Sequence, residues 1–267
     1  MISIKTPKEI EIMRQGGKIL ASVLSALAKE TKPGVATEWL NQLAEDLIFE
    51  KGALPAFKGY QGFPSALCVS INEQIVHGLP SKRKIKEGDV VGLDLGILFP
   101  PEHCGGCPFS QGCQGEPGMY TDAAISVGAG KISEQSKKLL QTTKGALDTA
   151  IDLIKPSRKL SEISAAIQKY SESRGFSVIR ELVGHGVGNE LHEEPEIPNF
   201  SEGWPGKEVI LEEGMTLAIE PMFSAGGQGI KKGKDKYSFE TKDGSIAAHF
   251  EHTIVVTKDG CEILTEI

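Results

Sequence analysis

The sequence has no long hydrophobic run, no excess of basic residues and few cysteines, and each absence removes a class of protein. Its 267 residues contain no run of eighteen apolar ones, so a membrane-spanning helix is not expected. Asp and Glu (36) outnumber Lys and Arg (29), which argues against a general nucleic-acid binder and against DNA as a partner. Five cysteines are too few for a disulfide scaffold, and residues 1–9 lack the apolar stretch of a signal peptide. We therefore expect a cytoplasmic protein.

Two pairs of helices are predicted, one pair in each half of the chain. Apolar residues at helical spacing predict them at about 7–31, 37–51, 133–154 and 161–173. Pro33 and Pro156, which end the first helix of each pair, are 123 residues apart, and so are Gly52 and Gly175. We interpret this repeat as a duplication within a single domain that spans 1–267, with halves of about 6–130 and 131–267.

Strands are predicted after each helix pair. The segments are 66–71, 90–99 and 120–127 in the first half, and 215–223, 245–257 and 261–265 in the second. Turns rather than helices separate neighbouring strands, which favours antiparallel pairing and an α+β fold. The glycines of 184–188 are not followed by a helix, so they do not form a dinucleotide-binding motif.

Four acidic residues lie in segments that otherwise resemble buried strands: Asp94, Asp122, Glu220 and Glu251. A buried carboxylate without a partner is costly, so four of them indicate a shared cation. Asp94 precedes Glu220 by 126 residues and Asp122 precedes Glu251 by 129, so each half would donate two acids from equivalent strands. Four carboxylates balance two divalent ions, and we therefore predict a dinuclear metal centre.

Histidines supply candidates for a nitrogen ligand and for contacts to a substrate. His185 lies between two glycines, which leave its imidazole accessible to a Mn, Fe, Co or Zn ion. His77 and His192 are candidate hydrogen-bond donors to a substrate. His249 and His252 flank Glu251, and the sequence leaves open whether they act at the site or only in the fold.

These residues belong to seven motifs that follow one another in a recognisable order. The motifs are His77-Gly78-Leu79-Pro80, Asp94, Thr121-Asp122-Ala123, Gly184-His185-Gly186-Val187-Gly188, His192-Glu193-Glu194-Pro195, Ala218-Ile219-Glu220-Pro221 and Phe250-Glu251-His252-Thr253. Over nearly the whole chain, the set resembles the type I methionine aminopeptidases. The resemblance implies a pita-bread fold, in which two pseudo-symmetric halves share a curved antiparallel sheet covered by helices. It also implies a metal-dependent hydrolase that removes the initiator methionine from nascent proteins.

The resemblance assigns the metal ligands. Asp122 and Glu251 would bridge two divalent ions, His185 and Glu220 would complete one site, and Asp94 would complete the other. Co, Mn, Fe and Zn are all compatible with these ligands.

The resemblance also assigns the substrate contacts. His77 and His192 would face the substrate, and a methionine pocket would be lined by Phe57, Tyr60, Phe63, Cys68, Leu191 and Tyr237. Aromatic rings and one thiol suit a flexible thioether, because sulfur–aromatic contacts add to apolar burial.

Three of the assigned residues would act in catalysis. The two cations would supply a hydroxide near neutral pH. His192 would donate a hydrogen bond to the developing oxyanion, and Glu220 would carry the proton from water to the leaving amine. His77 would hold the nitrogen of the scissile bond, and a free α-amino group at a metal would restrict cleavage to the first residue.

The chain departs from the family between its two metal-binding aspartates. A segment of about 99–119 is inserted where the family has a short connection, and it contains Cys104, Cys107 and Cys113. We expect an extended surface loop. The alternatives are a zinc site that also uses His103 and, less compatible with a reducing compartment, a Cys104–Cys113 disulfide.

Smaller departures concern the site itself. Gly96 stands where the family usually has Thr, and Leu191 and Tyr237 replace bulkier aromatic residues of the pocket.

Two other functions compete with the one that the resemblance implies. A pita-bread hydrolase acting before proline usually has a preceding domain, for which a helix that starts near residue 7 leaves no room. A pita-bread protein that only binds ribosomes or other partners would have lost metal ligands that are present here. The expected partner is the N-terminal methionine of nascent polypeptides, with transient ribosome contact through the basic runs 82–86 and 231–234, and the expected state is a monomer.

Overall fold

The computed structural model describes residues 2–101 and 118–266. The helices are α1 (Pro7–Glu30), α2 (Thr37–Glu50), the short 3-10 turn η1 (Tyr60–Gly62), α3 (Glu134–Leu153) and α4 (Leu160–Glu172). The strands are β1 (Leu54–Pro55), β2 (Leu67–Ile71), β3 (Gln74–Val76), β4 (Val90–Phe99), β5 (Met119–Gly128), β6 (Ser177–Val178), β7 (Gly184–Gly186), β8 (Glu193–Ile197), β9 (Thr216–Ile219), β10 (Met222–Ser224), β11 (Ile230–Lys232), β12 (Phe239–Thr241), β13 (Ala247–His249), β14 (Glu251–Val256) and β15 (Cys261–Ile263). The zinc site and disulfide considered for His103, Cys104, Cys107 and Cys113 lie outside the described residues.

Helices α1 and α3 begin where side chains satisfy their first amide groups. Thr6 Oγ1 accepts a hydrogen bond from the amide of Glu9, and the carboxylate of Glu9 accepts one from the amide of Thr6. Ser133 caps α3 in the same way, by accepting from Ser136. All four long helices lie within a residue or two of the ranges predicted from apolar spacing.

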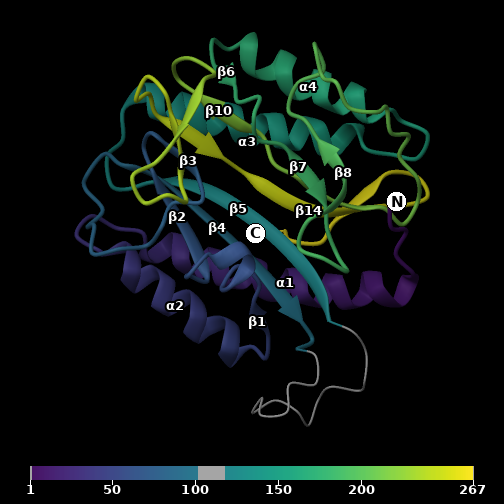
Figure 1. The fold of residues 1–267 in the computed structure, drawn as a ribbon, viewed down its shortest axis with the longest axis horizontal. Helices are drawn as coiled ribbons and strands as arrows, with labels where there is room; N and C mark the ends of the chain where they lie inside the picture. The colour runs from purple at the N-terminus through teal and green to yellow at the C-terminus, as the bar shows by residue number, and fades with distance from the viewer. Residues whose placement is uncertain (1, 102–117, 267) are drawn as a thin grey trace.

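A nine-stranded sheet forms the centre of the molecule. Its main path is β1-β4-β5-β14-β9-β7-β8, with β2 paired to β4 and β15 paired to β14. Two three-stranded sheets, β13-β10-β6 and β11-β12-β3, complete the described part. All pairings among the described strands are antiparallel, which confirms the α+β prediction. In the view of Figure 1, α1 and α2 lie below the long β4–β5 hairpin and α3 and α4 lie above it. The two helix pairs pack against the same face of the sheet.

Alternation along the strands separates a helix-covered face from an open face. In β4, Leu93, Leu95 and Ile97 are fully buried in a cluster with leucines of α1 and α2. Asp94 and Gly96 lie between them and therefore project from the opposite face. Since the helices cover only one face, the open face is available for a site.

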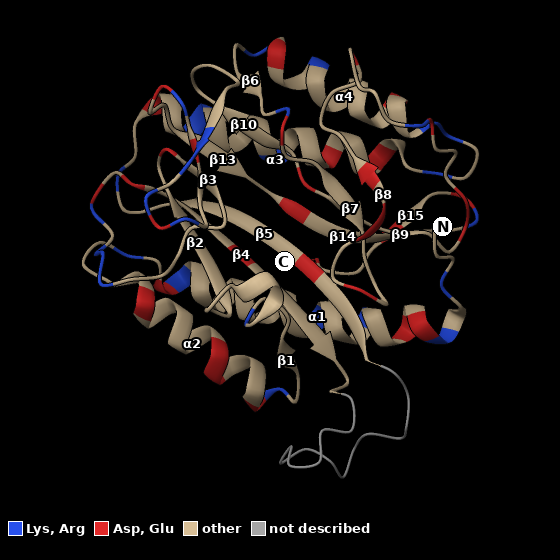
Figure 2. Cartoon of the chain, in the orientation of Figure 1, with Lys and Arg blue, Asp and Glu red and all other residues tan. Residues whose placement is uncertain are grey.

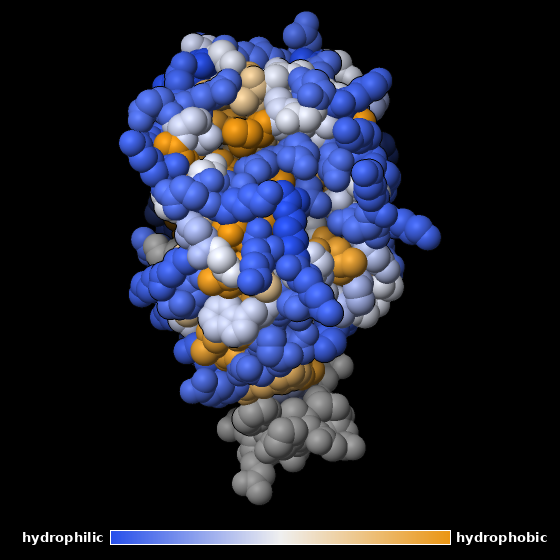
Figure 3. All heavy atoms as spheres, turned by 90° about the vertical axis from the view of Figure 1, so that its left-hand side faces the viewer, coloured by the Kyte–Doolittle hydropathy of each residue, from blue (hydrophilic) through white to orange (hydrophobic). Residues whose placement is uncertain are grey.

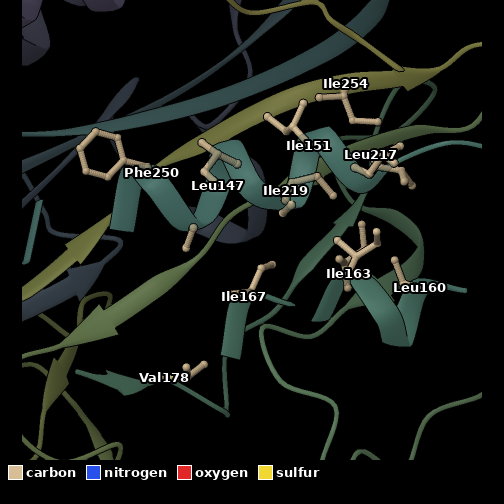
Figure 4. Packing of buried hydrophobic residues seen from close by; sticks show 14 of the residues in the cluster. Leu147, Ile151, Leu160, Ile163, Ile167, Val178, Leu217, Ile219, Phe250 and Ile254 are labelled. Atoms are coloured by element: carbon tan, nitrogen blue, oxygen red, sulfur yellow. The ribbon is translucent and has the colours of Figure 1, made fainter. Parts of the chain in front are cut away.

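The second half builds an equivalent core beneath α3 and α4. Leu217 and Ile219 of β9 and Ile254 of β14 are fully buried against these helices, as Figure 4 shows. No helix in the described part of the chain is long and apolar enough to cross a membrane. The face shown in Figure 3, which is the left-hand side of Figure 1, is covered largely by hydrophilic residues.

Two strands that were predicted as continuous are each broken in two, and these predictions were wrong. The segment 215–223 is interrupted at Glu220-Pro221, and the segment 245–257 is interrupted at Phe250. Pro221 has no amide hydrogen to donate to a ladder, so the chain leaves the large sheet there. Strands β9 and β14 belong to the large sheet, whereas β10 and β13 pair with each other in a separate one.

The N-terminal segment is tied to the second half of the chain. Ile4 forms an isolated bridge with Met215, and Lys5 Nζ lies 2.7 Å from Glu193 Oε2. The Lys5 side chain is only 1% exposed, so this ion pair is buried. It fixes the segment that follows His192 against the start of the chain.

Candidate metal centre

The register of β4 and β5 brings Asp94 and Asp122 to the same face. Gly96 pairs with Asp122 and Asp94 pairs with Ala124, so the two carboxylates are diagonal neighbours on adjacent strands. Glu251 also pairs with Ala124, which places it on the same face across β5. The three acids therefore come from three neighbouring strands of one sheet.

His185 and Glu220 reach the same face through Ala218. His185 of β7 pairs with Ala218 of β9, and Glu220 follows Ala218 by two residues at the end of that strand. Thr253 of β14 connects the three acids with His185 and Glu220. Its hydroxyl donates to the carbonyl of Asp122 at 2.7 Å, and its strand pairs with β9. Figure 2 shows the acidic segments in the middle of the sheet, away from the outline of the molecule.

The candidate ligand atoms lie close enough together to hold a metal ion. One atom from each of Asp94, Asp122 and Glu251 lies within 4.8 Å of the other two, and so does one from each of His185, Glu220 and Glu251. Glu251 belongs to both groups. A third such group joins Asp122 and His185 to His192, which the sequence assigned to the substrate rather than to a metal.

Burial makes the four carboxyl groups poor anions unless a cation is near. Desolvation raises the pKa of Asp122 to about 8, and the charge of Glu220 adds to this. Burial likewise raises the pKa of Asp94, Glu220 and Glu251 well above the usual range, and neighbouring carboxylates raise those of Asp94 and Glu251 further. Because burial disfavours the charged carboxylates, the site can carry its full negative charge only when a cation is bound.

His185 points an unprotonated ring nitrogen toward the acids. Its Nδ1 lies 2.9 Å from the carbonyl of Gly186, so a proton on Nδ1 is donated there and Nε2 is left as an acceptor. Nε2 lies 3.6 Å from Glu220 Oε1 and 3.9 Å from Asp122 Oδ2. Burial lowers the pKa of His185 to about 3, which keeps the imidazole neutral.

His77 and His192 line the same cavity as the acids. The Tyr60 hydroxyl lies 2.8 Å from His192 Nδ1, and the rings of His192 and His185 are in edge contact, with centroids 4.2 Å apart. His77 has a positive φ of 56°, which a non-glycine residue adopts only when its surroundings impose it. Burial lowers the pKa of His77 to about 4, so it too is neutral.

One cavity of about 340 Å³ contains every residue that the sequence assigned to the site. Its apolar part is the cluster of Phe57, Phe63, Cys68 and Leu191, bordered by Tyr60 and Tyr237. Burial raises the pKa of the Cys68 thiol well above its usual value, so the thiol is neutral and serves as an apolar surface.

The structure adds residues that the sequence analysis did not assign. Gln61, Val76, Lys232 and Lys236 also line the cavity. His249 Nε2 lies 3.3 Å from Glu220 Oε2, whereas His252 Nδ1 lies 3.1 Å from the Thr265 hydroxyl, away from the acids. Strand alternation could not have found this, because the strand is interrupted at Phe250 and His249 belongs to a different sheet from Glu251.

Comparison with known proteins places this arrangement among characterised enzymes. A family model, metallopeptidase family M24, matches residues 11–105 and 109–258. Methionine aminopeptidase 1 of Bacillus subtilis is 44% identical over 267 residues, which is 100% of both chains. The crystal structure of a methionine aminopeptidase from Thermotoga maritima has a TM-score of 0.90 and 45% identity, again over 100% of both chains. A prolidase from Pyrococcus horikoshii is 24% identical, with a TM-score of 0.75 over 98% of this chain and 63% of its own, and shares the fold.

Proposed function

The chain belongs to metallopeptidase family M24, in which it is a methionine aminopeptidase with the pita-bread fold, and we propose that five of its side chains hold two divalent cations for this reaction. The cleaved group is the initiator methionine. The proposed ligands are Asp94, Asp122, His185, Glu220 and Glu251. Glu251 would serve both ions, because it belongs to both groups of close ligand atoms.

Two unpaired buried oxygens carry this proposal. Asp122 Oδ1 and Glu251 Oε1 are buried and have no hydrogen-bond partner among the described residues. A buried carboxylate oxygen without a partner costs several kcal/mol, unless a cation takes that position. Both residues are the ones assigned as bridging ligands, so the orphaned atoms fit the group that the family requires.

The chain's own residues position the substrate and move the proton. When bound, the divalent cations act as Lewis acids and make a hydroxide nucleophile available near neutral pH. Glu220 accepts the proton of the attacking water on its carboxylate, and delivers it to the leaving amine.

The two histidines bind the scissile peptide. When the Tyr60 hydroxyl donates to His192 Nδ1, the ring proton is on Nε2, which can donate to the substrate oxygen as negative charge develops. His77 faces the same cavity as a neutral imidazole and holds the nitrogen of the scissile bond. The methionine side chain occupies the pocket of Phe57, Tyr60, Phe63, Cys68, Leu191 and Tyr237.

We also propose how the protein acts in the cell. Residues 1–267 act as one catalytic domain with halves 6–130 and 131–267, as a monomer in the cytoplasm. Lys82, Lys84, Lys231 and Lys234 are exposed and available for transient contact with ribosomal RNA. Cosedimentation with ribosomes should weaken as salt is raised, and binding insensitive to salt would contradict this contact.

Methionine release from Met-Ala-Ser tests the function and the metal count together. The chelated protein should be inactive, and titration with Mn, Fe, Co or Zn should restore release and reach saturation at two bound ions per chain. Full activity with one bound ion would overturn the dinuclear proposal. Cleavage of Xaa-Pro peptides without release of methionine would instead overturn the assignment of the substrate.

A further inference from the structure

We propose that Gly96 and Phe57 act as a complementary pair that sets the depth of the methionine pocket, so that position 96 determines which N-terminal side chains this enzyme accepts. The inference rests on the proposed function, because it concerns the proposed methionine pocket. It assigns a role to Gly96, which the proposed function leaves without one.

The ring of Phe57 occupies the space that a side chain at position 96 would fill. A β carbon on Gly96 would lie 2.7 Å from Phe57 Cε1 and 3.2 Å from Phe57 Cδ1. Heavy atoms cannot approach so closely, so any larger residue at 96 requires the ring to move. Ala56 closes the other side, with its β carbon 3.3 Å from the same point.

The backbone holds Phe57 over Gly96. Strand β1 pairs with β4 up to Pro55 and Ile97, and the Ala56 amide donates to the Gly96 carbonyl at 2.9 Å. The next residue therefore has little freedom to shift along the sheet. A ring pushed by a side chain at 96 must move away from the sheet.

The cavity lies in that direction. Gly96 pairs with Asp122, so its missing side chain would point to the same face as the metal ligands. Phe57 is 8% exposed, and it lines the cavity together with Asp122. Displacement of its ring would shorten the space left for a substrate side chain.

Gly92 on the same strand provides a matched control. It projects from the same face as Gly96, four residues away, and a β carbon there would meet no atom closer than 3.6 Å. Alanine should fit at 92 but not at 96. Comparing Gly96→Ala with Gly92→Ala therefore separates the clash with Phe57 from any general effect of replacing a glycine in β4.

Peptides of the form Xaa-Ala-Ser, with norvaline, methionine or ethionine at the first position, test the pair. Gly96→Ala should lower kcat/KM for methionine by ~10-fold, since one methylene group in a hydrophobic pocket is worth roughly 10–200-fold. The loss should be larger for the longer ethionine and smaller for the shorter norvaline, and Gly92→Ala should leave the ratios unchanged. An equal loss for all three peptides would overturn the inference, since it would indicate damage to the reaction rather than to the pocket.

A second variant and a metal measurement make the test decisive. Adding Phe57→Leu to Gly96→Ala should restore the ratio of methionine to norvaline, because leucine leaves room for the new methyl group. Phe57→Leu alone should favour ethionine over methionine, and it decides the question if Gly96→Ala does not fold. A loss of bound metal in Gly96→Ala, or no change in selectivity with Phe57→Leu, would overturn the inference. If the unmodified enzyme releases no methionine at all, it is the proposed function that fails.

Discussion

The two halves of the molecule supply equivalent acids to the site from strands of different character. Asp94 and Asp122 lie in the middle of β4 and β5, which are continuous ten-residue strands. Glu220 directly follows β9, and Glu251 is the first residue of β14. In the first half, an unbroken ladder of hydrogen bonds on both sides of each aspartate sets the direction of its carboxylate. In the second half, the chain leaves the sheet next to each glutamate.

The broken strands of the second half need additional support. Asn199, which is fully buried, donates from its side chain to the carbonyl of Glu220 at 3.0 Å. That bond replaces the ladder that ends at Pro221. The comparison indicates that the first half works as a fixed platform, and that the second half places its acids by local side-chain contacts.

The largest effect is expected from removing the charge of Glu220, the proposed proton carrier in the second half. Glu220→Gln should lower kcat on Met-Ala-Ser by about 10²–10⁴-fold, because the proton transfer loses its carrier. Glu213→Gln, an exposed change of the same kind, is the control. Activity of Glu220→Gln retained in metal-saturated buffer would contradict the proposed role of Glu220.

Metal removal should destabilise the site where the halves meet, and more so at higher pH. The pKa of Asp122 is raised from 3.8 to about 8, so folding is favoured while the group is protonated and that contribution is lost as pH rises through this range. The buried histidines, whose pKa values are lowered, add stability as pH rises to about their ordinary value of 6.5, and above it they are neutral in both states. The unfolding free energy of the chelated protein should therefore fall as pH rises from about 7 to 8. Metal at a hundred times its Kd should add about 2.7 kcal/mol, measured by urea denaturation. A chelated protein that is more stable at pH 8 would contradict the burial of these acids.

Removing the support of the second half should affect both stability and activity. Asn199→Ala leaves the buried carbonyl of Glu220 without a donor, which should cost about 1–3 kcal/mol in chemical denaturation. Turnover should fall as well, since Glu220 is no longer held. Unchanged kcat together with lower stability would show that the bend does not depend on this bond.

The smallest effect concerns a turn that the two halves share. Gly34 (φ 93°) and Ser157 (φ 68°) occupy equivalent turns, and their amides donate to Ile85 and Leu211, both at 2.8 Å. A β carbon on Gly34 would meet no atom within 4 Å, so Gly34→Ala tests backbone strain alone and should cost about 1 kcal/mol. Ser157→Gly should stabilise the fold by no more than about 1 kcal/mol. Glycine removes the strain of the positive φ, but it also raises the conformational entropy of the unfolded chain. If Ser157→Gly raised the melting temperature by as much as Gly34→Ala lowered it, the unfolded chain would have no such offsetting effect.

Local signals in the sequence predicted the helices and the long hairpin. Helix α1 is bounded by Thr6 and the Lys32-Pro33 pair, and β4 is an almost continuous apolar run. The break at Glu220-Pro221 has a signal in the sequence, since proline cannot donate to a ladder, whereas the residues around Phe250 include no proline or glycine. Whether such a segment stays in one sheet depends on partners that are distant in the chain.

The acids were identifiable because charge in an apolar strand is costly wherever the strand lies. The individual ligand and pocket roles came from the family resemblance, and they stay predictions until the variants are measured. The contact of Phe57 with Gly96 could not be predicted, because residues 39 apart meet only through the pairing of β1 with β4. His249 was left open for a similar reason, since its approach to Glu220 depends on both strand breaks.

The buried pair of Lys5 and Glu193 makes the first few residues a part of the opposite half. A chain cut between residues 130 and 131 would give two fragments that still share this ion pair, the Ile4–Met215 bridge and the ladder between β5 and β14. Each fragment would carry two of the four acids, so neither could hydrolyse a peptide alone. Reassociation of the fragments would then switch on activity, and the enzyme could be used as a split reporter whose signal reads out their association.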